Sequence, residues 1–118
     1  MKTDRELLEA AAKAAGVDGE YRTENLCHDG DWIDVTAIFL SDDQGWWNPL
    51  IDDGDALRLA VALRIEIEPW IHGDSACARA AVREVLIDEP HYGDDPERAT
   101  RRAIVRAAAA MAAVPAVG

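Results

Sequence analysis

The sequence predicts one small α+β domain spanning residues 1–118, with helices packed on a largely antiparallel four-stranded sheet. Its 118 residues are enough to bury a core without metals or disulfides. A content of 49% hydrophobic and 30% charged residues is typical of a globular protein. Segments with helical spacing of apolar residues alternate with segments typical of strands. The expected order is α-β-β-α-β-β-α, as in an α/β/α sandwich, with helices covering both faces of the sheet.

The N-terminal third predicts a helix and a hairpin. Thr3 and Glu6 have the spacing of a capping box, in which each side chain bonds the other residue's backbone N–H, so a helix over residues 4–15 should follow. Residues 32–40 are rich in β-branched and aromatic residues. We expect residues 19–24 to pair with them as a short edge strand across a polar loop.

The middle of the chain predicts a second helix after a turn. Residues 41–45 have the composition of a turn. Trp46 and Trp47 are then expected on a connection, because Pro49 disfavours helix at the residue before it. An aspartate at position 52 or 53 should cap the helix, whose apolar residues continue at helical spacing to about position 63.

The next segment predicts the second pair of strands. Residues 64–68 alternate between polar and apolar, as a half-buried strand does. Residues 77–87 are their expected antiparallel partner across a loop at 69–76. The alanines of 77–87 are also compatible with helix, so that alternative stays open for this segment.

The last helix is expected to begin with Asp95 as its cap and Pro96 at its first position. Its apolar positions are mostly alanine, which predicts a packing face of small residues. Pro115 should end this helix, and residues 114–118 are expected to form a frayed tail.

The formal net charge of −11 limits the classes of partner. With 23 acidic against 12 basic residues, direct binding to nucleic acid or to anionic lipid is not expected, because phosphate binding depends on clustered Lys and Arg. A basic protein or a cation is the more natural partner. No apolar run approaches the roughly 20 residues that cross a bilayer, and the charged N-terminus does not look like a signal segment. We therefore expect a cytoplasmic location.

Three blocks of the sequence carry a resemblance to a known family. They are Trp47-Asn48-Pro49-Leu50 with DDGDALRLAV at 52–61, TDRELLE at 3–9, and GDDP at 93–96 with ATRRAIVRAAA at 99–109. In these blocks the chain resembles a family of small uncharacterised phage and prophage proteins described as having a phage α/β/α (ABA) sandwich domain. The resemblance implies that fold and an origin in a phage or prophage, and hence a bacterial host cell. It implies no reaction, cofactor or catalytic residue.

The residues themselves predict no catalytic, cofactor-binding or metal-binding site. The acidic cluster at 52–55 has oxygen ligands that suit calcium, but Leu63 stands where the loop's bidentate glutamate belongs, so helix capping is the favoured interpretation. The isolated residues that metals or nucleophilic chemistry use are His28, His72, His91, Cys27, Cys77, Ser41 and Ser75. None has the spacing or flanking residues of a known site. We expect neither a cofactor nor an enzymatic activity.

Two groups of residues are candidate contacts with a partner. Trp46 and Trp47 at a turn could form an exposed aromatic patch, the alternative being that one covers the core and the other is partly exposed. Arg98, Arg102 and Arg106 recur every four residues with Arg101 beside them. They form a basic stripe that could grip a carboxylate or phosphate surface, the alternative being a solvated face paired with nearby acids.

Two functional hypotheses follow. The first is a non-enzymatic module that binds an unknown protein partner, with a homodimer as a further option. The second is an acidic mimic of nucleic acid that inhibits a host DNA-binding or defence enzyme, suggested by the charge and by acidic pairs at 42–43, 52–53 and 94–95. A magnesium-dependent hydrolase would need convergent carboxylates, which no spacing in the sequence predicts. We favour the first hypothesis.

Overall fold

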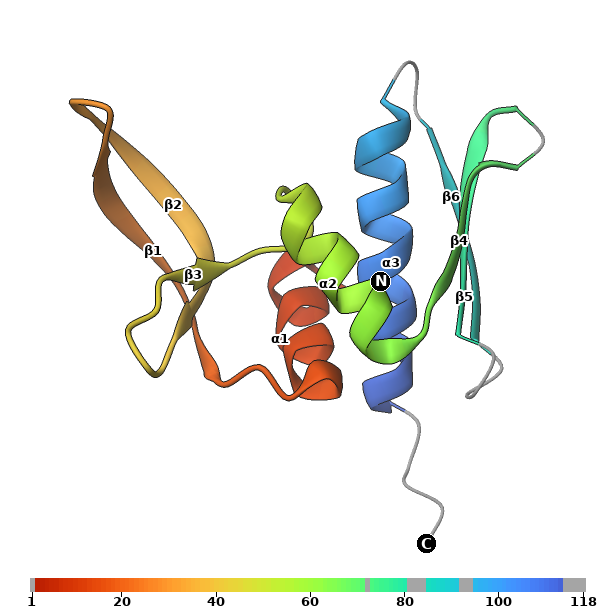
Figure 1. Cartoon of the computed structure of the whole chain (residues 1–118), viewed down its shortest axis with the longest axis horizontal. Coiled ribbons are helices and arrows are strands. Elements are labelled where there is room, and N and C mark those ends of the chain that lie inside the picture. Colours follow the sequence, from red (N-terminus) through yellow and green to blue (C-terminus); the bar gives the residue numbers. More distant parts are fainter. Residues whose placement is uncertain (1, 72, 81–84, 92–94, 114–118) are drawn as a thin grey trace, which may run out of the picture.

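The computed structural model describes residues 2–71, 73–80, 85–91 and 95–113. Within them, three helices lie between two separate three-stranded antiparallel sheets (Figure 1). The helices are α1 (Asp4–Ala15), α2 (Asp53–Leu63) and α3 (Pro96–Ala113). Sheet A contains β1 (Gly19–His28), β2 (Asp31–Leu40) and β3 (Trp46–Trp47), and sheet B contains β4 (Glu66–Ile71), β5 (Ser75–Ala80) and β6 (Val85–Pro90).

The α+β class is confirmed, but the prediction of one four-stranded sheet is wrong. The order along the chain is α-β-β-β-α-β-β-β-α, with no pairing between the two sheets in the described residues. The helices form the middle layer (Figure 1), whereas the expected sandwich has the sheet in the middle. Sheet B turns an apolar face to the helices, whereas sheet A contacts them only at its base, so the two groups of strands lie on different sides of the helical layer.

The helix starts predicted from caps are confirmed. Thr3 Oγ1 accepts the Glu6 N–H at 3.2 Å, and Glu6 Oε1 accepts the Thr3 N–H at 3.1 Å. Asp52, rather than Asp53, caps α2 by accepting the Asp55 N–H at 2.8 Å. The Asp95 carboxylate accepts the Arg98 N–H at 3.0 Å at the start of α3. The predicted end at Pro115 and the frayed tail at 114–118 lie outside the described residues.

The first hairpin is confirmed, with longer strands than predicted. Its turn contains only Asp29 and Gly30, and the pair His28↔Asp31 closes it. Both turn residues have positive φ, 52° and 86°, as a type I′ turn requires. The stretch expected to be a polar loop is therefore mostly strand. The tryptophans expected on a connection instead form β3, where Trp47 lies opposite Ile38 and Trp46 opposite Phe39.

The segment 77–87 is not a single partner for the preceding strand. Residues 77–80 belong to β5, which pairs antiparallel with β4 as predicted, whereas residues 85–87 belong to β6, which pairs with the other side of β5. Residues 81–84 are outside the described chain, and the loop expected at 69–76 is shorter, because β4 ends at Ile71 and β5 begins at Ser75. The helical alternative is therefore wrong for the described part of this segment. The physical reason is the two-residue period of its small side chains: Ala76, Ala78 and Ala80 are buried on one face.

Helix α3 is the centre of the core, because α1, α2 and all three strands of sheet B contact it. Its buried side chains are mostly alanine, and the alanines of β5 belong to the same cluster. Such small side chains let the helix and the sheet approach closely. Sheet A reaches this core only near its base, through Ile38 and Trp47 and the half-buried Tyr21 and Leu40. The rest of its hairpin projects away from the helices (Figure 1).

A leucine in the contact between α3 and β5 should destabilise the fold. We expect Ala78→Leu to lower the free energy of unfolding by about 1–3 kcal/mol, because the close-packed contact has no room for three more carbons. Urea unfolding measures this. The matched control is Arg79→Leu, whose side chain lies on the other side of β5 and should change stability by less than about 0.5 kcal/mol. Equal effects of the two substitutions would contradict the packing described.

The capping box of α1 should make stability depend on pH. Bonds from the Thr3 backbone N–H and hydroxyl hold the pKa of Glu6 below its ordinary value of 4.5. Since the folded-state pKa is the lower one, the contribution of the ionised cap is complete above pH 4.5 and is lost as the pH falls through the folded-state pKa. We expect the stability advantage of the wild type over Glu6→Gln to shrink on acidification below pH 4.5. A difference independent of pH would contradict this.

Candidate functional site

Sheet A has two faces of different character. Opposed residues of an antiparallel pair point to the same side, so the register assigns each side chain to a face. Ile38 and Trp47 point toward the helices and belong to the main core. The opposite side, called the outer face, carries Glu20, Arg22, Glu24, Leu26 and His28 of β1, Asp31, Ile33, Val35, Ala37 and Phe39 of β2, and Trp46 of β3.

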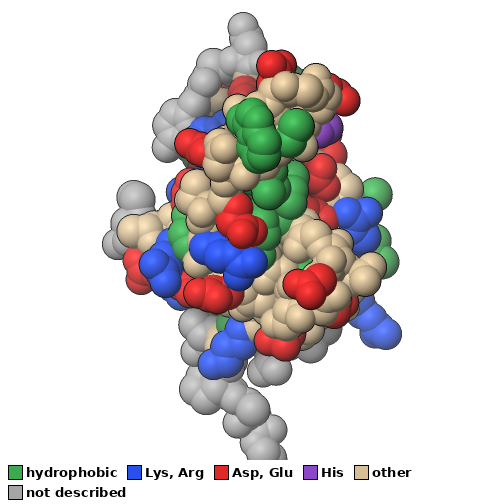
Figure 2. Space-filling view, turned by 90° about the vertical axis from the view of Figure 1, so that its left-hand side faces the viewer, with side chains coloured by type: hydrophobic (Ala, Val, Ile, Leu, Met, Phe, Trp, Pro, Cys, Tyr) green, Lys and Arg blue, Asp and Glu red, His purple; other side chains and the backbone are tan. Residues whose placement is uncertain are grey.

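The outer face has an apolar centre. Val35, Ala37 and Phe39 form a small buried cluster of their own, separate from the main core, with Leu26 packed against it. Ile33 is 44% exposed and Trp46 37% exposed. Figure 2 faces this hairpin and shows hydrophobic side chains gathered in a stripe with charged side chains on both sides. Ile33 and Trp46 are thus the exposed apolar part of the outer face, whereas Val35, Ala37 and Phe39 are already buried within the described chain.

Charged side chains border this apolar centre. The Arg22 guanidinium lies 4.7 Å from the centre of the Phe39 ring, which suits a cation–π contact. The same guanidinium lies 3.5 Å from the Glu20 carboxylate and 3.4 Å from that of Glu24. One arginine between two glutamates, with Asp31 further along, leaves the outer face with an excess of negative charge.

The inner face of the same hairpin is polar in the middle of its length. Thr23 and Thr36 share a hydrogen bond of 2.7 Å, and Asn25 donates to Asp34 at 3.0 Å. These cross-strand pairs stiffen the hairpin where no helix supports it. At its end, Trp32 is 69% exposed opposite the exposed Cys27.

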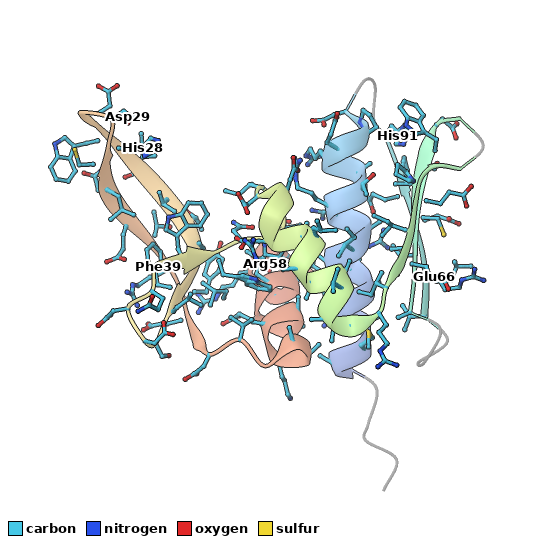
Figure 3. The ribbon with its side chains drawn as sticks, viewed as in Figure 1. His28, Asp29, Phe39, Arg58, Glu66 and His91 are labelled. Carbon is cyan, nitrogen blue, oxygen red and sulfur yellow. The ribbon has the colours of Figure 1, made fainter. Side chains whose placement is uncertain are left out.

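A buried polar network joins the hairpin to the helices. The Asn48 N–H donates to Asp55 Oδ2 at 2.9 Å, and Asn48 Nδ2 donates to the carbonyl of Thr36 in β2 at 2.9 Å. Asp55 is buried, and Arg58 neutralises it through a 2.7 Å contact. Figure 3 shows Arg58 on α2 and Phe39 in sheet A on the two sides of this junction. The network therefore fixes the direction in which the hairpin leaves the helices.

The structure separates the residues predicted from sequence as partner contacts. Trp46 is on the outer face, whereas Trp47 is only 8% exposed and fills the core. Arg101 has a structural role, since its Nε donates to the Leu50 carbonyl at 2.9 Å and its Nη1 lies 2.7 Å from Asp53 Oδ1. The other three arginines of the stripe, Arg98, Arg102 and Arg106, line a separate hollow between α1, β6 and α3.

Other exposed apolar residues were not predicted as contacts. Trp32 and Ile33 at the end of the hairpin were missed, although the Asp29-Gly30 turn signal could have placed them there. A second apolar hollow, of about 340 Å³, lies between α2, β4 and α3 and includes Leu57, which is 59% exposed, and Trp70. A substitution in this second hollow can therefore serve as a control for a substitution on the outer face.

The titratable residues singled out in the sequence do not converge. His28 and His91 lie on opposite sides of the molecule (Figure 3), and His72 is outside the described residues. His91 is buried, with Nε2 2.7 Å from the Pro69 carbonyl and its ring against Trp70. In the described ranges no three His, Cys, Asp or Glu side chains are grouped as metal ligands. In the acidic cluster at 52–55, Asp52 caps α2, Asp53 pairs with Arg101, and Asp55 pairs with Arg58.

Comparisons with protein-family models, with curated proteins and with solved structures found no match to this chain. The resemblance to phage proteins therefore stays a prediction from the sequence blocks. No helix in the described part of the chain has the length and apolar character needed to span a membrane.

The two cysteines should differ in reactivity. Burial and the neighbouring Asp88 raise the pKa of the Cys77 thiol, so that less of it is the reactive thiolate at neutral pH. Cys27 is exposed at the end of the hairpin. We expect iodoacetamide to alkylate Cys27 several-fold faster than Cys77, measured by mass spectrometry of peptides from timed samples. Faster alkylation of Cys77 would contradict the placement of these two residues.

Proposed function

We propose that this chain is a non-enzymatic protein-binding module, with the outer face of sheet A as its contact surface. A role as a phage or prophage accessory protein is part of the proposal, and it is supported by the sequence resemblance alone. The proposal retains Trp46 among the residues first suggested as contacts. It replaces Trp47 with Ile33, because Trp47 is buried and Ile33 is exposed on the outer face.

The main support for the proposal is the distribution of polar and apolar side chains between the two faces of the projecting hairpin. Beyond its base, the side that faces the helices carries Thr–Thr and Asn–Asp pairs, with Trp32 and Cys27 at its end. The side that faces away carries the buried apolar cluster, with Ile33 and Trp46 exposed beside it. A hairpin that served only its own core would place these faces the other way round. An apolar centre with a charged border is typical of a surface that buries against another protein.

The charges around the outer face favour a particular kind of partner. Glu20, Glu24 and Asp31 border the apolar centre, and Arg22 is the one arginine or lysine among them. A partner surface with an apolar side chain flanked by Lys or Arg would complement this pattern. This agrees with the basic protein partner expected from the net charge of −11.

The alternative function, mimicry of nucleic acid, draws on the same charge. It gains no support from the acidic pairs that suggested it, because most of their described members have local partners. Asp42 Oδ1 accepts the Gln44 N–H at 3.0 Å, Asp52 caps α2, and Asp95 caps α3. Asp53 pairs with Arg101, and Asp94 lies outside the described residues.

Affinity capture with matched variants tests the proposal. The tagged chain is incubated with a bacterial host lysate at about 0.1 M and about 0.5 M salt, and retained proteins are identified by mass spectrometry. We expect a partner that the wild type retains at both salt concentrations, because its contact is mainly apolar. Ile33→Ser should reduce its recovery about tenfold or more, as for a residue central to an interface.

The matched control is Leu57→Ser, which removes an exposed apolar side chain from the other hollow. Recovery should then equal that of the wild type. Loss of the partner with Leu57→Ser and not with Ile33→Ser would contradict the assignment of the outer face. A DNA-binding protein that is released at high salt and is indifferent to Ile33→Ser would instead support the mimicry alternative.

A further inference from the structure

Four basic side chains gather in one hollow of this acidic protein. The hollow has a volume of about 590 Å³ and lies where α1, β6 and α3 meet. Lys2, Arg98, Arg102 and Arg106 line it together with apolar side chains that include Leu7 and Ile87. A volume of this size is within the usual range for small-molecule sites, roughly 300–1,000 Å³. Its lining therefore combines positive and apolar side chains.

The acids in the hollow explain only part of this positive charge. The buried carboxylate of Glu89 contacts Arg106 Nη1 and lies 3.4 Å from Arg102 Nε, and Asp4 lies 3.0 Å from Arg102 Nη1. These are the two acidic residues of the lining. Four positive against two negative charges leave a surplus of two. Burial of Glu89 requires a counter-charge, and Arg102 and Arg106 supply it without Arg98.

Arg98 is the residue that the fold does not account for. Its backbone N–H completes the cap of α3, but its exposed side chain makes no ion pair with another described residue. It lies one helical turn before Arg102, so both side chains leave the same side of α3, and both line the hollow. Nε and Nη1 of Arg102 face Glu89 and Asp4, which leaves its Nη2 and the whole Arg98 guanidinium to donate N–H groups to carboxylate or phosphate oxygens.

We propose that this hollow binds a small organic anion, a carboxylate or a phosphate monoester with an apolar body. The anionic group lies between Arg98 and Arg102, and the body lies against Leu7 and Ile87. The hollow is formed by other elements than the outer face of sheet A. This site therefore stands independently of the proposed protein-binding function.

Titration of the full chain with phenyl phosphate, followed by ¹H–¹⁵N NMR, tests the site. We expect progressive shifts at Leu7, Ile87 and the first two turns of α3. Inorganic phosphate should bind more weakly, because it lacks the apolar body, and benzylamine should cause no shifts there. Arg98→Gln should weaken the binding of phenyl phosphate about tenfold or more, the usual effect of losing a hydrogen bond to a charged group.

Arg79→Gln is the matched control, because Arg79 is an exposed arginine that pairs with Glu66 on the far side of sheet B. It should leave the affinity for phenyl phosphate within about twofold of the wild type. Absence of shifts at millimolar phenyl phosphate, or equal effects of the two arginine substitutions, would overturn the proposal. Equal affinity for inorganic and phenyl phosphate would overturn the assignment of an organic ligand.

Discussion

The close contact between α3 and sheet B is the constraint on which the rest of the structure depends. Alanines on both sides, such as Ala103 in the helix and Ala78 in β5, bring the two backbones close together. The remaining sides of α3 pack against α1 and α2. A helix surrounded in this way has little surface left for another sheet. Sheet A is therefore attached at the edge of the core, mainly through α1, and its hairpin projects into solvent.

Each sheet is also tied to the helices by a buried carboxylate with hydrogen-bonding partners. Asp55 connects α2 to the chain that follows β3, and Glu89 connects β6 to α3. A buried charge is costly unless it is paired, and no buried side-chain N or O atom of the described residues lacks a hydrogen-bond partner. Because a shift of either sheet would leave a buried carboxylate without its partners, these ties oppose movement of the sheets against the helical layer.

Local signals in the sequence predicted local structure well. The three helices begin where their caps predict, because the residues that form a cap lie within three positions of each other. Pairing between distant strands was predicted poorly. The Asp29-Gly30 turn signal was missed. The pattern of residues 64–68 and 77–87 also does not reveal that their sheet contains three strands of its own and does not include the first hairpin. The outer face was not predicted for a related reason. Alternation along β2 shows that Ile33 and Asp34 point to opposite faces, but it does not show which face the helices cover.

The short length of β3 has a consequence for the edge of sheet A. After Trp47, Asn48 donates its side-chain amide to the carbonyl of Thr36, as a third strand residue would do with its backbone. Pro49 then has no N–H to continue the ladder. Beyond this point β2 pairs along one side only within the described chain, so its other side keeps main-chain donors and acceptors in contact with water. Such an edge invites strand addition, and the carboxylates of Asp31 and Asp34 along it repel the same edge of another copy.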